Sequence, residues 1–135
     1  MTDKQAPAKA APVFAEGLPK PIGPYSPGVT LDQLVLVSGQ GATVPGTGQL
    51  AGNDVGTQTE QVFKNINAIL EAAGTDLSHV LRCGVFLVDL RDFDAMNEVY
   101  ARVFGDHRPA RTTVQVAALP DKGLRVEIDA IAYRS

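Results

Sequence analysis

The β-rich run Val80–Val88 is the feature that most constrains how this chain can fold. It carries Val, Leu, Cys and Phe at both odd and even positions, so a strand formed here is apolar on both faces. Such a strand is stable only where both of its faces are covered, as in the interior of a sheet. The run therefore predicts a central strand, and the segments on either side of it must supply the cover.

Two amphipathic helix patterns flank this strand. The first begins after a capping residue, Asn53 or Asp54, and ends at Gly74; the second begins after Asp92. Each places its apolar residues on one stripe, which predicts a helix packed on the sheet through that stripe. The apolar residues are Val55, Val62, Ile66, Ile69, Leu70 and Ala73 in the first helix, and Phe93, Met96, Tyr100, Val103 and Phe104 in the second.

Three further β-rich segments complete the pattern. Residues Leu34–Val37 predict an early strand, and Thr112–Leu119 and Leu124–Tyr133 predict two late ones, joined as a hairpin around Pro120–Gly123. In the last strand, alternate residues are apolar, so one face packs under the helices. Its other face is polar but includes Ile131 and Tyr133, a mixture typical of a subunit interface. The predicted fold class is α+β, with a mixed sheet and two helices packed on one face.

Composition separates a tail from a folded domain. Residues 1–18 are rich in Ala, Pro and Lys and have few bulky apolar side chains, which predicts a flexible N-terminal tail. Residues 19–135 are then expected to form a single domain, since a chain of 135 residues suits one core. No apolar run approaches the roughly 20 residues of a membrane span, and we expect a cytoplasmic protein.

Charge and cysteine content exclude several classes of site. The net charge of −3 and pI near 5.2 argue against binding to nucleic acid or an anionic membrane surface. The single cysteine, Cys83, has no disulfide partner, and its apolar neighbours predict a buried, inert thiol. His79 and His107 have no ligand spacing around them, so we expect no metal site and two surface histidines.

Four residues stand out as candidates for a binding site. Arg111 follows Pro109 at a loop-to-strand junction, where a guanidinium can grip a carboxylate with two hydrogen bonds. Asn97 falls within the apolar stripe of the second helix, Glu127 lies on the polar face of the last strand, and Tyr25 lies in a Pro/Gly-rich loop. Each also has a structural explanation: a solvated arginine, a helix-fixing amide, a solvated carboxylate and a gap-filling aromatic.

Taken together, five segments resemble the Rid (reactive intermediate deaminase, YjgF-type) family. They are Ile22–Gly28, Val37–Gln40, Asn97–Tyr100, Pro109–Thr112 and Val126–Ala130. The resemblance covers about residue 19 to the end of the chain. It implies a chorismate-mutase-like (YjgF-like) fold, a homotrimer with active sites between subunits, and no cofactor. It also implies hydrolytic deamination of 2-iminobutanoate, 2-iminopropanoate and 2-aminoacrylate to 2-keto acids and ammonia.

The resemblance also implies roles for individual residues. Arg111 matches the arginine that binds the substrate carboxylate, and Glu127 the acid that orients or activates the attacking water. The cleft is expected to be lined by Tyr25, Ser38 and Asn97. The Ser38–Gly39 backbone is a further candidate contact with the substrate. Two departures are visible: Thr113 stands where many members have a reactive cysteine, and the segment from Tyr100 to Arg111 is shorter than in those members.

Two other functions compete with deamination. A trimer that binds 2-keto acids without turnover needs the same arginine, because gripping a carboxylate requires no general base. Nucleic-acid cleavage, attributed to some relatives, needs a basic surface that this acidic composition does not predict.

Overall fold

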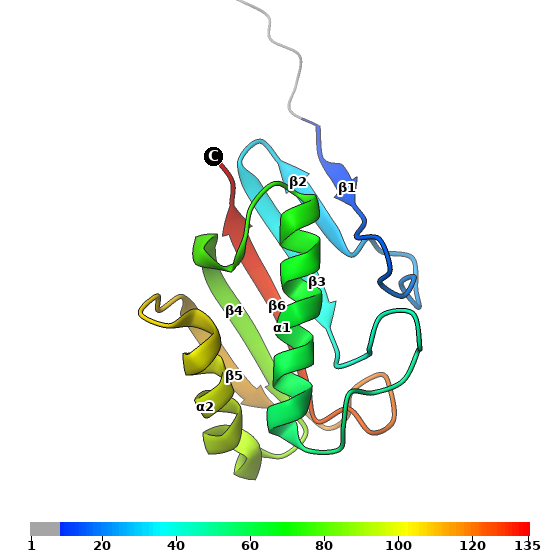
Figure 1. The fold of residues 1–135 in the computed structure, drawn as a ribbon, viewed down its shortest axis with the longest axis vertical. Coiled ribbons are helices and arrows are strands. Elements are labelled where there is room, and N and C mark those ends of the chain that lie inside the picture. The colour runs from blue at the N-terminus through cyan, green and yellow to red at the C-terminus, as the bar shows by residue number, and fades with distance from the viewer. Residues whose placement is uncertain (1–8) are drawn as a thin grey trace, which may run out of the picture.

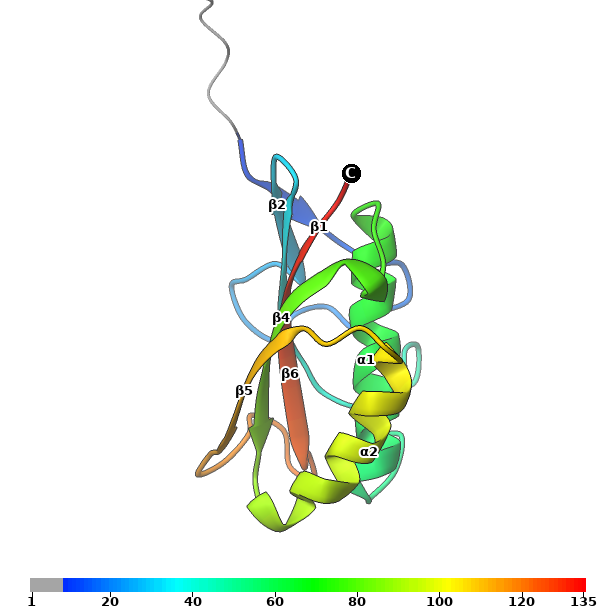
Figure 2. The same cartoon turned by 90° about the vertical axis from the view of Figure 1, so that its left-hand side faces the viewer.

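A six-stranded mixed sheet carries two long helices on one face, as Figures 1 and 2 show. The computed structural model describes residues 9–135. The predicted α+β class, with two helices on one side of a mixed sheet, is confirmed. In chain order the strands and helices are β1 (Ala11–Val13), β2 (Gly28–Leu31), β3 (Leu34–Gln40), α1 (Val55–Ala72), η1 (Leu77–His79), β4 (Val80–Leu87), η2 (Leu90–Asp92), α2 (Phe93–Phe104), β5 (Ala110–Gln115) and β6 (Val126–Tyr133).

The strand order is β1-β2-β3-β6-β4-β5, so β4 lies between two neighbours as predicted. The predicted hairpin between the two late strands is wrong. β5 instead pairs with β4 in parallel, while β6 pairs antiparallel with both β3 and β4. The physical reason is the crossover: α2 carries the chain from the end of β4 back to the start of β5, and a crossover joins parallel strands.

The ends of the helices follow local hydrogen bonding. Asp54 caps α1, because its Oδ2 accepts a hydrogen bond from the Thr57 amide at 2.8 Å, and Gly74 follows the helix with a φ of +89°. α2 begins directly after Asp92, as predicted, but the Asp92 carboxylate makes no capping hydrogen bond and pairs with Arg125 instead. Asp89 caps the short turn η2 ahead of α2.

The core lies between the helices and the sheet. Along β6, Val126, Ile128, Ala130 and Ala132 are buried and the residues between them are partly exposed, as the alternation predicts. Cys83 on β4 has no exposed surface, which confirms the buried thiol. The opposite face of the sheet carries large exposed apolar side chains: Leu34, Leu36, Val114 and Tyr133.

The N-terminal region differs from the predicted flexible tail. Residues Ala11–Val13 form β1, paired with β2 at one edge of the sheet, and the Val13 side chain is buried. An edge strand is held by backbone hydrogen bonds, so its low content of bulky apolar residues does not prevent pairing. Residues 1–8 of the predicted tail lie outside the described residues. Within residues 9–135 no helix is long and apolar enough to cross a membrane.

Candidate active site

Arg111 is the second residue of β5 and points to the helix side of the sheet. Its register partner is Cys83 on β4, which lies in the core beneath α2. The Arg111 guanidinium carbon lies 4.7 Å from the centre of the Tyr100 ring and 5.6 Å from that of Phe93. Both distances fall within the range of cation–π attraction. The loop-to-strand junction predicted for Arg111 therefore places its charge over two aromatic rings of α2.

A cavity of about 270 Å³ opens beside this guanidinium, lined by Asn97, Tyr100, Ala101, Arg108, Pro109 and Arg111. Within residues 9–135, no carboxylate lies within ion-pair distance of Arg111. Asn97 is half-buried, and its amide has no hydrogen-bond partner in the same part of the chain. The structural explanation for Asn97, a helix-fixing hydrogen bond, is therefore not observed, and the amide remains available to a ligand.

Glu127 lies on the other face of the sheet. Its neighbours Val126 and Ile128 point into the core, so Glu127 points away from the helices, opposite Phe86 on β4. Burial raises the pKa of the Glu127 carboxyl, and the nearby charges of Asp129 and Asp121 raise it further. A carboxylate with a raised pKa is a better proton acceptor than an ordinary surface glutamate.

The space for this carboxylate depends on Gly39 in β3. A methyl group at Gly39 would lie 2.8 Å from the Oε2 atom of Glu127, closer than real side chains approach. Gly39, Tyr25 and Glu127 line one cavity of about 110 Å³. Ser38 ties β3 to the loop that carries Tyr25. Its hydroxyl donates a 2.7 Å hydrogen bond to the carbonyl oxygen of Ser26, the residue that follows Tyr25 in the chain.

The predicted site residues therefore form two groups on opposite faces of the sheet. Arg111 and Asn97 lie on the helix side, whereas Glu127, Tyr25 and Gly39 lie on the open side. Arg111 and Glu127 therefore line two different cavities of the chain.

Two hydroxyls near Arg111 are buried, Tyr100 Oη and Thr113 Oγ1. Thr113 Oγ1 has no hydrogen-bond partner among residues 9–135, whereas the neighbour of Tyr100 Oη is the Cys83 thiol. Burial raises the pKa of the Tyr100 hydroxyl, and it raises the pKa of the Cys83 thiol to about 11. At neutral pH both groups therefore stay protonated. The apolar stripe of the second helix predicted only a core role for Tyr100 and Phe93. Their spacing of two helical turns, shortly before Arg111, was the available signal for a second role.

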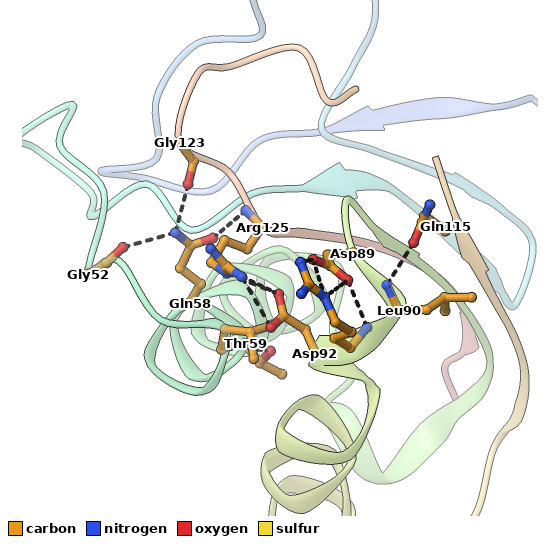
Figure 3. Close-up of polar contacts among 11 residues, drawn as sticks. Gly52, Gln58, Thr59, Asp89, Leu90, Asp92, Gln115, Gly123 and Arg125 are labelled. Carbon is orange, nitrogen blue, oxygen red and sulfur yellow. Dashed lines mark hydrogen bonds and ion pairs between the residues drawn. The ribbon is translucent and has the colours of Figure 1, made fainter. Parts of the chain in front are cut away.

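A polar network supports the end of the sheet ahead of Glu127 (Figure 3). The buried Gln58 side chain donates to the carbonyl oxygens of Gly52 and Gly123, both at 2.9 Å, and accepts from the Arg125 amide at 2.8 Å. The Arg125 guanidinium in turn binds Asp92. The sequence does not predict this role for Gln58, because a glutamine in a helix carries no signal of its hydrogen-bond partners.

A larger hollow of about 640 Å³ lies between the starts of α1 and α2, away from the predicted residues. Its two arginines are already paired, Arg125 with Asp92 and Arg102 with Glu60, so they are less available to an anionic ligand than Arg111. We therefore assign the candidate site to the Arg111 cavity.

The histidines have structural contacts. His107 Nε2 lies 2.6 Å from the Val80 carbonyl oxygen, and His79 lies beside Asp76 and Tyr133. Both are partly buried, so the prediction of two surface histidines is only approximate. Among residues 9–135, no cluster of three His, Cys, Asp or Glu side chains could hold a metal ion.

The mixed sheet, its two helices and the arginine at the end of β5 define a small α+β protein of the YjgF type. Residues 16–134 match the family described as Endoribonuclease L-PSP, and the chain belongs to this family. The resemblance to Rid proteins is confirmed. YyfA from Yersinia pestis, a structure of the Rid protein family, is 39% identical, with a TM-score of 0.87 over 93% of this chain and 99% of that one.

Relatives with more specific names are similar over most of the chain. The human 2-iminobutanoate/2-iminopropanoate deaminase is 45% identical over 86% of this chain and 84% of its own. A RutC family protein from Pyrococcus horikoshii is 48% identical over 90% of this chain and 96% of its own. The structure of E. coli TdcF with bound serine is 41% identical, with a TM-score of 0.86 over 93% of this chain and 99% of that one.

Proposed function

We propose that this protein hydrolyses reactive 2-imino acids, 2-iminobutanoate and 2-iminopropanoate with its enamine form 2-aminoacrylate, to 2-keto acids and ammonia. The observation that carries the proposal is the Arg111 guanidinium, which faces a cavity and has no ion-pair partner among residues 9–135. Relatives that are 45–47% identical support the reaction, since the human, goat and bovine proteins are named as 2-iminobutanoate/2-iminopropanoate deaminases.

Arg111 is the proposed anchor for the substrate. Its planar guanidinium can donate two parallel hydrogen bonds to a carboxylate, each contributing about 1.5–3 kcal/mol when one partner is charged. The anchor fixes the position of the imine carbon, which is bonded directly to the carboxylate carbon. A water molecule held nearby then attacks from a defined direction, which removes much of the entropic barrier.

Glu127 is the proposed proton acceptor. The imine reacts in its N-protonated form. As the water oxygen bonds to the imine carbon, the C=N π electrons pass to nitrogen and one water proton passes to the Glu127 carboxylate, which gives a neutral carbinolamine. Glu127 then returns that proton to the nitrogen, the C–N bond breaks with its electron pair leaving on ammonia, and the hydroxyl proton passes back to the Glu127 carboxylate as the keto group forms. The raised pKa of Glu127 suits both halves of this exchange.

A homotrimer is part of the proposal. Arg111 and Glu127 lie on opposite faces of one sheet, so the reaction needs Arg111 from one subunit and Glu127 from its neighbour. The open face of the sheet carries the exposed apolar residues Leu34, Leu36 and Tyr133, which suit a subunit interface. We propose three subunits because the resemblance to Rid proteins implies a trimer.

The test generates 2-iminobutanoate with an amino acid oxidase and traps the free imine with semicarbazide. The protein should suppress the trapped product by converting the imine to the keto acid first. We expect Arg111→Ala to abolish suppression and Arg111→Lys to impair it strongly, because lysine lacks the planar fork. Arg91→Ala is the matched control, since this arginine is highly exposed and its one ion-pair partner among residues 9–135 is Asp89, just ahead of η2. Full activity in Arg111→Ala would refute the mechanism.

Subunit mixing tests the shared site. Arg111→Ala and Glu127→Gln chains are each expected to be inactive. When they are unfolded together in equal amounts and refolded, about one interface in four combines an intact arginine with an intact glutamate by simple probability. Recovery of about a quarter of wild-type activity is the expected result. No recovery, with trimers formed and the wild type refolding to full activity, would rule out a site between subunits.

Binding of 2-keto acids without turnover is the second candidate function. The observation in its favour is that Arg111 and Asn97 alone provide a carboxylate site on one chain, and TdcF, a related structure, holds serine. The trapping experiment separates the two functions, because a binding protein leaves the amount of trapped imine unchanged. Nucleic-acid cleavage is not proposed, although the family is described as Endoribonuclease L-PSP, since the net charge of −3 argues against binding to nucleic acid.

A further inference from the structure

The Arg111 guanidinium is held against two rings that belong to one helix. Phe93 begins α2 and Tyr100 lies two turns later on the same face, so both rings meet the end of β5. Tyr100 is the closer ring, with its centre 4.7 Å from the guanidinium carbon, against 5.6 Å for Phe93. The charge is therefore placed by α2 as well as by its own strand.

The Tyr100 ring is itself fixed by its neighbours. It meets Phe63 of α1 edge to face with the ring centres 5.5 Å apart, and its centre lies 4.9 Å from that of Phe104. Only 7% of Tyr100 is exposed. A ring held on several sides has few alternative rotamers, so the surface that it offers to Arg111 is rigid.

An aromatic support has a different effect from a carboxylate support. An acidic partner would occupy the N–H donors of the guanidinium, and a ligand would have to displace it. An aromatic face attracts the positive charge through its π electrons and leaves the in-plane donors free. Residues 9–135 supply two such rings to Arg111 and no carboxylate within 4.0 Å.

We propose that Phe93 and Tyr100 are positioning residues that aim the Arg111 guanidinium at a ligand carboxylate, and that Tyr100 acts through its ring and not its hydroxyl. The hydroxyl oxygen is buried and its neighbour is the Cys83 thiol of the core, so it is not exposed to a ligand in the cavity. The inference rests on the proposed function, because it assigns the support of the same carboxylate anchor.

The test compares four variants: Tyr100→Leu, Tyr100→Phe, Phe93→Leu and Phe14→Leu. Phe14→Leu is the control for the loss of a phenyl ring, because Phe14 is exposed and is not among the rings over Arg111. Two quantities are measured for each: KM for 2-iminobutanoate in the trapping assay, and Kd for the product 2-ketobutanoate by calorimetry. Circular dichroism verifies that each variant is folded.

Tyr100→Leu is expected to raise KM and Kd about fivefold to thirtyfold, with a smaller change in kcat. Phe93→Leu, at a partly buried site, is expected to raise KM and Kd as well. It takes the place of Tyr100→Leu in the test if Tyr100→Leu fails to fold. Tyr100→Phe keeps the ring and should stay within about twofold of wild type, as should the Phe14→Leu control. The Arg111 Nε–H signal in nuclear magnetic resonance should shift in Tyr100→Leu and Phe93→Leu but not in the control, because ring currents act on it directly.

Two results would overturn the inference. A loss in Tyr100→Phe equal to that in Tyr100→Leu would assign the role to the hydroxyl. An unchanged Kd and an unshifted Arg111 signal in folded Tyr100→Leu and Phe93→Leu would show that the rings do not position the guanidinium. These results differ from failure of the proposed function, in which the wild-type protein itself neither suppresses the trapped imine nor binds 2-ketobutanoate.

Discussion

Replacement of Gln58 by leucine tests how a buried amide holds the segment that leads to Glu127. The Gln58 side chain is fully buried and makes three hydrogen bonds of 2.8–2.9 Å to Gly52, Gly123 and Arg125 (Figure 3). Each hydrogen bond contributes about 1 kcal/mol net, and its loss leaves a backbone group without a partner. Since water can reach the partly exposed Gly52 and Arg125 and the exposed Gly123, we expect Gln58→Leu to lower the free energy of unfolding by about 2–3 kcal/mol.

Urea unfolding at one fixed protein concentration measures this loss, because the apparent stability of an oligomer depends on concentration. Gln115→Leu is the matched control: the Gln115 side chain accepts one exposed hydrogen bond, from the Leu90 amide at 2.8 Å, so we expect a loss below about 1 kcal/mol. Gln58→Glu keeps the acceptor for Arg125 but loses both donors when ionised, so its destabilisation should grow as pH rises. A loss in Gln58→Leu no larger than in the control would refute this account of the network.

Further predictions concern the site and the thiol. The raised pKa of Glu127 means that deaminase activity should fall at a higher pH than for an ordinary carboxylate, as acid protonates the base; a kcat profile against pH measures this. The same shift means that charging Glu127 opposes folding, so Glu127→Gln should raise the melting temperature at pH 7, with a gain that shrinks as pH falls through the raised pKa towards 4.5. Gly39→Ala should lower kcat with little loss of stability, since the new methyl group displaces the flexible end of Glu127; unchanged activity would mean that Glu127 needs no such space. Cys83, with a pKa of about 11 and no exposed surface, should react with thiol reagents only when the protein unfolds, which alkylation in native and denaturing buffer compares.

Patterns within one element were read correctly from the sequence. The apolar spacing between Val55 and Ala73 indicated α1, and the Asp54 cap marks its start, because these features depend on helical geometry alone. The alternation along β6 likewise predicted which face is buried. The core position of Cys83 followed from its apolar neighbours in the same strand.

The pairing of strands that are distant in the sequence could not be predicted from such local patterns. The residues between β5 and β6 read as a hairpin turn, but the register of β5 is fixed by its parallel neighbour β4 and the crossover helix α2. β1 escaped detection because the composition of a short edge strand says little about backbone pairing. The placement of Arg111 and Glu127 on opposite faces depends on the pairing and register of β5 and β6 with β4. Alternation shows which residues of one strand share a face, but it does not show which face of a second strand lies on the same side of the sheet.

The division of Arg111 and Glu127 between two faces has a consequence for how the activity responds to dilution. If each working site combines residues of two chains, a freshly made single chain is inert, and activity per chain falls once the concentration drops below that needed for assembly. A substitution on the open face, such as at Leu36, could then abolish turnover in chains that are still folded. Melting temperature would be a poor guide to such variants, and specific activity measured across a dilution series would reveal them.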